Sequence, residues 1–372
     1  MKKDWEIKSF EDCIENVKYT TKIPSKDYKQ EGSFPIVSQE EELISGYWDN
    51  ENDLFSLTKP VVIFGDHTRV LKYVDFDFVL GADGVKILQP KNFLDTKFFM
   101  YFLSNANIKH LGYARHYRLL KELNVFVPPL EEQKRIVKIL DEKFAQLETI
   151  KTNAQTNLQN AKDLFQSQLA KAFSNTTWEK AKLEDIALDF SRGKSKHRPR
   201  NDKCLFGGNY PFIQTGDIRN ADKYVTDYTE TYNETGLAQS KLWPKGTLCI
   251  TIAANIAETA ILSFPCCFPD SVIGFIPNEK LTTVDFVYYL IQFFKSELQK
   301  LSKGAAQDNL NLAKLENMNF PLPPLPEQKR IVKELDALSE KVRQLQEIYT
   351  KQIANCDELK QSYLQKAFNA GL

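Results

Sequence analysis

The chain has 372 residues, more than one domain usually holds, so we expect two or three domains. Its 49 basic and 49 acidic residues cancel, which excludes a globally basic nucleic-acid coat and an acidic tail protein. Hydrophobic residues at 42% and charged residues at 26% are ordinary globular values, and they exclude wholesale disorder.

The start of the chain and its cysteines indicate a cytoplasmic protein. No run approaches about 18 apolar residues, and no apolar segment follows the N-terminal Met-Lys-Lys-Asp-Trp-Glu, so we expect neither a membrane span nor a signal peptide. None of the six cysteines forms a C-x-x-C pair, and the four histidines show no ligand spacing. We therefore expect no disulfide framework, no bound metal and a reducing compartment.

Two globular segments of mixed α/β character are expected. Each contains a short β-rich run followed by an apolar run typical of a buried helix: 61–64 and 98–103 in the first segment, 247–252 and 286–291 in the second. The connections are irregular, and no regular β-α-β alternation appears. The pattern therefore favours the α+β class over a doubly wound sheet.

Each globular segment is followed by a predicted long helix. Both helices begin at a Pro-Pro pair, at 128–129 and 323–324, where the first N–H groups of a helix lack partners anyway. Acidic residues then occupy the first turn, which the helix dipole favours. Beyond that turn neither segment contains Gly or Pro until it ends. About 42 residues at 1.5 Å per residue make a rod of about 63 Å.

The two halves of the chain repeat one another. Residues 128–141 read PPLEEQKRIVKILD and residues 323–336 read PPLPEQKRIVKELD, so 12 of 14 positions match at an offset of 195. Weaker matches precede them in the same order, at offsets of 173 (Trp5 with Trp178) and 188 (the two apolar runs). Two copies of one framework with loops of different length explain this drift. We therefore expect a pseudo-twofold internal repeat.

Both predicted helices carry apolar stripes at coiled-coil spacing. The stripe of the second helix passes through Gln352, its single polar member, which we interpret as a residue that fixes the register. Because an isolated rod of this length would leave its stripe in water, we expect the helices to pair antiparallel rather than pack each on its own domain. The expected seam residues are Leu140, Leu147, Ala154, Ala161, Leu335, Val342, Tyr349, Gln352 and Cys356.

The sequence contains none of the common catalytic motifs. Gly193-Lys194-Ser195 comes nearest to a phosphate loop, but Leu188 stands where that loop needs its first glycine. The patterns G-x-S-x-G, H-E-x-x-H and G-x-G-x-x-G are also missing. We therefore expect this chain not to be an enzyme.

Several loops have the composition of nucleic-acid contacts. Residues 191–203, SRGKSKHRPRNDK, hold six cations that can neutralise phosphates, and residues 113–118 interleave tyrosine with cations. Arginine can bind guanine, and amides can bind adenine. Solvated charged loops, a half-buried aromatic strand and plain turns are the alternative interpretations. The candidate DNA contacts are Asp66, His67, Thr68, Arg69, Tyr113, Arg115, His116, Tyr117, Arg118, Arg192, Lys194, Ser195, Lys196, Arg198, Arg200, Gln214, Thr215, Asn255, Gln307 and Asn309.

These motifs resemble a known family, the specificity subunits of type I restriction-modification systems. The resemblance rests on two P-P-L-x-E-Q-K-R-I-V segments, each closing a segment that opens with W-E-x-x-x-[FL]-E-D. The stretches F-G-D-H-T-R at 64–69, Y-A-R-H-Y at 113–117 and P-F-I-Q-T-G-D-I at 211–218 resemble that family's target recognition domains. Residues 304–310 resemble the usual approach to the second helix, whereas 112–115 depart from it, which suggests two domain subtypes.

The resemblance implies an architecture and a mechanism. Two mixed α/β target recognition domains, 1–127 and 176–322, would be separated and joined by two long antiparallel coiled-coil helices, 128–175 and 323–372. Each domain would read one half of a split sequence in double-stranded DNA, and the helices would set the spacer. Catalysis would belong to two modification subunits, which use S-adenosylmethionine for adenine-N6 methylation, and two restriction subunits, which use ATP and magnesium. This chain would bind no cofactor.

Other functions are compatible with the same features. The chain could serve a type II-like or methylation-only assembly, it could be a structural coiled-coil spacer, or it could be a cryptic enzyme that an assay of the isolated chain would reveal. The balanced charge indicates that positive charge is local, in loops such as 192–203, so we expect the isolated chain to bind DNA weakly.

Overall fold

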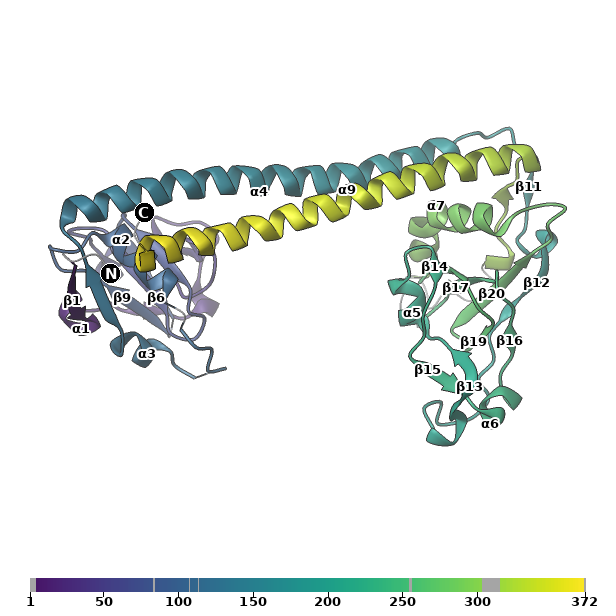
Figure 1. The fold of residues 1–372 in the computed structure, drawn as a ribbon, viewed down its shortest axis with the longest axis horizontal. Helices are drawn as coiled ribbons and strands as arrows, with labels where there is room; N and C mark the ends of the chain where they lie inside the picture. The colour runs from purple at the N-terminus through teal and green to yellow at the C-terminus, as the bar shows by residue number, and fades with distance from the viewer. Residues whose placement is uncertain are drawn as a thin grey trace. The chain divides into compact units, whose positions relative to one another are not determined.

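The computed structural model describes residues 5–82, 84–106, 108–112, 114–253, 256–302 and 315–370 (Figure 1). The chain forms two compact units, Met1–Thr156 with Tyr349–Leu372, and Asn157–Ile348. Each unit holds one globular part together with a stretch of each long helix. The fourfold division of the sequence at 127, 175 and 322 stays a prediction about segments, since packing groups the helix stretches with the globular parts. No helix of the described residues is long and apolar enough to cross a membrane.

The described residues of the globular part of unit 1 form three small sheets. Their strand orders are β2-β8-β3-β4 with β5 on β8, then β7-β6-β9, and the antiparallel pair β1-β10. Helix α2 packs on β6 and β7, where Phe98, Phe99 and Phe102 enter the core. The elements are β1 (Glu6–Ser9), α1 (Phe10–Cys13), β2 (Lys22–Ile23), η1 (Ser25–Asp27), β3 (Phe34–Val37), β4 (Gly46–Trp48), η2 (Glu51–Asp53), β5 (Leu54–Phe55), β6 (Val61–Gly65), β7 (Leu71–Val74), β8 (Phe78–Gly81), β9 (Val85–Leu88), α2 (Thr96–Asn105), α3 (Tyr117–Lys121) and β10 (Asn124–Val127).

In the described residues, the globular part of unit 2 also forms three sheets. The orders are β12-β20-β17-β18-β14, β15-β13-β19-β16, and the antiparallel pair β11-β21. Helix α7 packs on β18 and β20. The elements are β11 (Lys180–Ala181), η3 (Glu184–Ile186), β12 (Ala187–Arg192), η4 (Lys203–Leu205), β13 (Phe206–Phe212), α5 (Thr215–Asn220), β14 (Tyr224–Val225), β15 (Glu230–Tyr232), α6 (Glu234–Ala238), β16 (Leu242–Trp243), β17 (Leu248–Thr251), β18 (Thr259–Leu262), β19 (Cys266–Cys267), β20 (Val272–Pro277), α7 (Val284–Ser302) and β21 (Phe320–Pro321).

The two globular parts share one framework, which confirms the predicted internal repeat and the α+β class. A first strand pairs antiparallel with the last one in both (β1 with β10, β11 with β21), and a central strand lies between two antiparallel neighbours (β7-β6-β9, β18-β17-β20). The predicted strands at 61–64 and 247–252 are β6 and β17, and the apolar runs lie in α2 and α7. The remaining sheets differ between the units, so the variable part of each domain is inserted into a constant frame.

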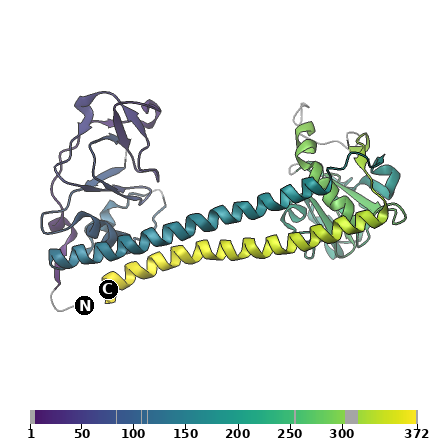
Figure 2. The same cartoon turned by 90° about the horizontal axis from the view of Figure 1, so that it is seen from above.

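Helices α4 (Leu130–Ala172) and α9 (Leu325–Gln365) pair antiparallel within each unit and lie side by side in both views (Figure 1, Figure 2). In unit 1 the start of α4 shares a core with the end of α9, and Lys151 pairs with Asp357 at 2.7 Å. In unit 2 the end of α4 shares a core with the start of α9. Five residues from Lys366 to Ala370 continue α9 as a π-helical turn.

The buried stripe of α9 differs from the predicted seam at one set of positions. Leu140, Leu147, Ala154 and Ala161 of α4 are buried, as are Leu335, Val342 and Cys356 of α9, while Tyr349 is half-buried. Gln352 is exposed, and so are Leu345 and Leu359, whereas Gln346 and Ile353 are half-buried. The prediction for Gln352 is therefore wrong. After both Val342 and Tyr349, the residue four positions on is less exposed than the residue three positions on, so the buried stripe follows the +4 side there.

Each long helix ends at the repeated Lys-Ala-Phe sequence, and the phenylalanine of that sequence packs in the core of the globular part at that end. Phe173, at the end of α4, stacks on Phe293 and packs on Phe286 of α7. Phe368, at the end of α9, packs on Phe98 and Phe102 of α2. Phe98 and Phe286 are repeat equivalents at the offset of 188. Each long helix thus starts at one globular part and ends in the core of the other.

Candidate nucleic-acid interface

In unit 1 the residues 64–69 and 114–117 of two motifs form one structure around Asp66. The carboxylate of Asp66 accepts a hydrogen bond from the Tyr117 backbone N–H at 2.7 Å, and its carbonyl accepts one from the His116 N–H at 2.8 Å. His116 is fully buried; its Nε2 accepts from the Leu111 N–H at 3.0 Å, so Nδ1 carries the proton donated to the Asp66 carbonyl. Asp66 is 2% exposed. Both residues are buried away from solvent, so the prediction that they contact DNA is wrong; they join two loops.

The exposed parts of these two loops carry the remaining candidates. Thr68, Arg115 and Arg118 are exposed and His67 is half-buried. Arg69 has a positive φ of 64° and donates to the Ile108 carbonyl at 3.0 Å, so it braces the second loop. Lys109 and His110, which sequence reasoning missed, are also exposed on that loop.

Tyr117 is half-buried in unit 1 and does not stand free for stacking. Its ring packs edge-on against Phe10, and the Lys86 and Lys121 ammonium groups lie 5.2 and 5.7 Å from the ring centre. Burial raises the pKa of its hydroxyl. Tyr113 lies outside the described residues, as do Asn255, Gln307 and Asn309 among the candidates of unit 2.

In unit 2 some residues of the basic loop, 191–203, are fixed by hydrogen bonds and ion pairs, and others are exposed to solvent. The Gln239 side-chain oxygen accepts from the Lys196 and His197 N–H groups at 2.6 and 3.1 Å. Arg200 pairs with Asp270 at 2.7 Å. Ser195 is buried, which removes it from the candidate contacts, and Arg198 donates to its carbonyl. Within the described residues, the loop cations that are exposed and have no ion-pair partner are Arg192, Lys194, Lys196 and Lys203.

The exposed cations of this loop predict a change in the salt dependence of DNA binding. Replacing Arg192, Lys194 and Lys196 by alanine is expected to reduce the slope of log K against log salt by about one unit per lost phosphate contact. Binding of the chain to duplex DNA at several salt concentrations measures this. A matched control replaces the exposed Lys329, Lys333 and Lys341 of α9. An equal slope for the loop variant and wild type would show a merely solvated loop.

Two further candidates of unit 2 lie at the start of α5, where Asp217 caps the backbone of one of them, Gln214. Gln214 is exposed, but it precedes α5, its N–H donates to Asp217 at 2.7 Å, and its side-chain amide donates to Glu230 at 2.8 Å. Thr215 is half-buried at the first position of α5. Both lie at the start of a helix, on the 211–218 stretch.

His197, Asp202 and Cys204 come together although their spacing in the sequence suggested no such cluster. His197 Nε2 lies 3.0 Å from Asp202 and 4.0 Å from the Cys204 sulfur. The Cys204 backbone N–H, followed by His197, lowers the pKa of Asp202 to about 2. These contacts join His197 to Asp202 and Cys204, at the end of the basic loop.

One glutamine of each repeated motif joins its globular part to the long helix that follows. Sequence reasoning missed both residues. Gln133 and Gln328 are fully buried. The amide of Gln133 donates to the carbonyls of Phe93 and Pro128 at 2.9 and 2.8 Å. That of Gln328 donates to the repeat-equivalent carbonyls of Leu281 and Pro323 at the same distances. A polar residue repeated at the start of both helices was the available signal.

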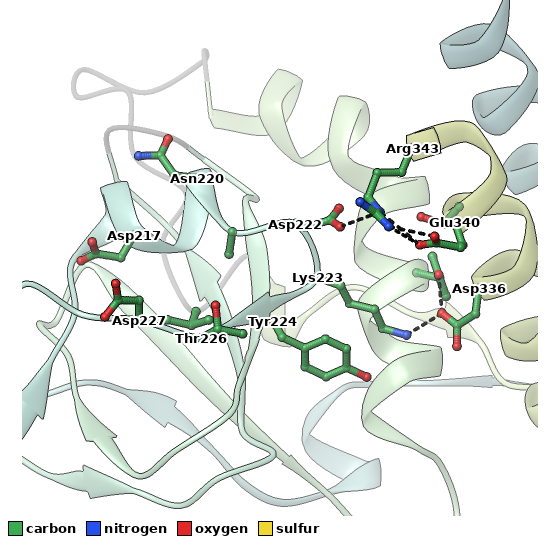
Figure 3. Close-up of a pocket in the computed structure, with 14 residues that line it drawn as sticks. Asp217, Asn220, Asp222, Lys223, Tyr224, Thr226, Asp227, Asp336, Glu340 and Arg343 are labelled. Carbon is green, nitrogen blue, oxygen red and sulfur yellow. Dashed lines mark hydrogen bonds and ion pairs between the residues drawn. The ribbon is translucent and has the colours of Figure 1, made fainter. Parts of the chain in front are cut away.

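A cavity of about 520 Å³ in unit 2 lies between the segment 217–227 and α9 (Figure 3). Acidic side chains predominate in its lining: Asp217, Asp222, Asp227, Asp336 and Glu340, against Lys223 and Arg343. Acidic groups thus outnumber basic ones in this lining, which gives it little attraction for phosphate.

The comparisons identify the family. Residues 2–158 and 175–353 match the model of the type I restriction modification DNA specificity domain, and the chain belongs to this family. It is 25% identical over 340 residues to the EcoR124I/EcoR124II specificity subunit of Escherichia coli, covering 84% of this chain and 81% of that one. It is 23% identical to the putative MjaX specificity subunit of Methanocaldococcus jannaschii, covering 91% and 87%.

Solved structures share the fold over the whole chain. A chain from a study of assembly and conformational transition of the type I R-M system superimposes with a TM-score of 0.77 at 19% identity, covering 100% of this chain and 99% of that one. The HsdS subunit of Thermoanaerobacter tengcongensis gives 0.57 at 19% identity, covering 100% and 98%.

Proposed function

We propose that this chain is the DNA-recognition subunit of a type I restriction-modification enzyme and that it reads a bipartite target, one half-site per globular part. The observation that carries the proposal is the constant frame with unlike inserts. Two similar frames can bind two copies of one partner and lie on two half-sites. Their differing sheets and loops can then contact two different base sequences.

The long helices set the distance between the half-sites in this proposal. Each runs without interruption from one unit into the other. About one turn of B-DNA, roughly 34–36 Å, is the natural separation of half-sites for such a pseudo-twofold arrangement, and a rod of about 63 Å exceeds it.

Exposed apolar residues on the helices support two copies of one partner. Ile150 and Leu345 are 40% and 36% exposed, and Leu164 and Leu359 are 45% and 46% exposed. The members of each pair are repeat equivalents at the offset of 195, so each unit offers one residue of both pairs. Two modification subunits carrying S-adenosylmethionine would dock here, and two restriction subunits using ATP and magnesium would join them.

This chain supplies recognition and binds neither cofactor in the proposed assembly. Its six cysteines are all free thiols, which suits the reducing cytoplasm. A type II-like or methylation-only assembly is the alternative, and the presence of a restriction subunit in the purified complex distinguishes the two. Mapping of N6-methyladenine in cells with and without the chain tests the proposal itself.

A further inference from the structure

Asp141 of α4 and Asp336 of α9 occupy the same place in the repeated motif, and each accepts a hydrogen bond from a tyrosine of its globular part. The Tyr101 hydroxyl of α2 donates to Asp141, and the Tyr289 hydroxyl of α7 donates to Asp336 at 2.6 Å. Tyr101 and Tyr289 are repeat equivalents, 8% and 1% exposed. The two frames are therefore joined to their long helices in the same way.

Each of these two carboxylates also pairs with a lysine, but the two lysines come from different parts of their units. In unit 1 it is Lys97 of α2, 2.8 Å from Asp141 and part of the constant frame. The equivalent position in unit 2 is Asp285, which has the opposite charge. Lys223 replaces the missing cation from the inserted segment between α5 and β14; its ammonium lies 2.6 Å from Asp336 and 2.7 Å from Asp285.

Lys223 is the more deeply enclosed of the two lysines. Its side chain is 15% exposed, against 37% for Lys97. The rings of Tyr224, Tyr288 and Tyr289 lie 5.1–5.6 Å from its ammonium group. Burial alone would lower the pKa of Lys223, but the hydrogen bonds to Asp285 and Asp336 raise it above its usual value. The ammonium group thus stays charged between two carboxylates.

The neighbouring residue makes a second connection to α9 with reversed polarity. The Asp222 carboxylate lies 3.9 Å from the Arg343 guanidinium, which Glu340 holds at 2.8 Å (Figure 3). Glu347 also pairs with Arg343, at 2.5 Å. Asp336 and Arg343 are seven residues apart and therefore lie on one face of α9. Asp222 and Lys223, two successive residues of the insert, thus pair with residues of α9 that lie one heptad apart.

We infer that Lys223 is a positioning residue for target reading by unit 2. This inference rests on the proposed function. By holding the segment 222–223 on α9, Lys223 fixes α5 and the 211–218 stretch before it relative to the spacer helix. In unit 1 the corresponding lysine lies in the frame, so its loss does not release an inserted segment.

The test uses the full chain assembled with its modification subunits. Methylation rates are measured on the cognate duplex and on duplexes with one base pair changed in either half-site. Lys223→Met keeps the length of the side chain and removes the charge. It is expected to lower discrimination at the half-site of unit 2 about tenfold, the worth of roughly one base pair, and to leave the other half-site unchanged. Lys223→Arg should restore most of the discrimination.

Lys97→Met is the matched control, because it removes the same kind of ion pair from the frame of unit 1. It should lower the thermal stability and leave discrimination at both half-sites within about twofold of wild type. Asp336→Asn, which keeps an acceptor for Tyr289, serves if Lys223→Met does not fold; it should also weaken reading by unit 2 alone. Unchanged discrimination in the folded variants, or equal loss at both half-sites, would overturn the inference. A wild-type complex that discriminates at neither half-site would instead contradict the proposed function.

Discussion

Replacing Gln328 by leucine is expected to lower the free energy of unfolding of unit 2 by about 3 kcal/mol, because several buried polar groups lose their partners together. The Leu281 and Pro323 carbonyls lose their donor, and the Thr282 hydroxyl loses its acceptor at 2.9 Å. Urea denaturation followed by the fluorescence of Trp178 and Trp243 measures the change.

The same substitution at Gln352 is the matched control. Gln352 is exposed on the same helix, so Gln352→Leu should change the free energy of unfolding by no more than about 0.5 kcal/mol. Were Gln352 a buried residue that fixes the register, its replacement would alter both stability and helix pairing. A small effect at Gln328, or a large one at Gln352, would therefore contradict the packing described for α9.

Deleting one heptad from both long helices is expected to shorten the preferred spacer between the half-sites. Residues 151–157 of α4 and 346–352 of α9 are repeat equivalents that avoid the exposed Ile150 and Leu345, and seven residues are close to two helical turns, so the buried stripes stay aligned. The lost rise is about 10 Å, which limits the shortening to about three base pairs.

A library of targets with spacers of different length, offered to the assembled methyltransferase, measures this shift. Deletion from α4 alone is the control; it makes the two helices unequal in length by about 10 Å, so their ends cannot both keep their shared cores, and it should abolish the complex rather than move the optimum. An unchanged spacer preference in the active double-deletion variant would refute the helices as the spacing element.

The repeat made much of the fold predictable from the sequence. Twelve matching positions at one offset require two similar structures, and long segments without Gly or Pro that bear apolar stripes predict paired helices. The repeated Lys-Ala-Phe marked the helix ends, although its packing on α2 and α7 emerged only from the structure. The inserts share no such pattern, so their sheets could not be derived.

The errors in the candidate site have a common physical cause. Asp66 and His116 have side chains that suit DNA contacts, but the same donors and acceptors also satisfy buried backbone groups, and composition does not distinguish the two. The prediction for Gln352 failed because an apolar stripe at coiled-coil spacing does not show which of its two flanks is buried. Arg200 is not a free cation, because Asp270, seventy residues away in sequence, pairs with it, and a sequence pattern does not reveal such a contact.

Adenine methylation tests the central claim most directly. Mapping of N6-methyladenine in DNA from cells that carry the modification subunit, with and without this chain, should reveal a split motif with a fixed unread spacer only when the chain is present. Exchange of residues 176–322 for another recognition domain should change one half of that motif and keep the other. A motif that persists without the chain, or an undivided motif, would contradict the account.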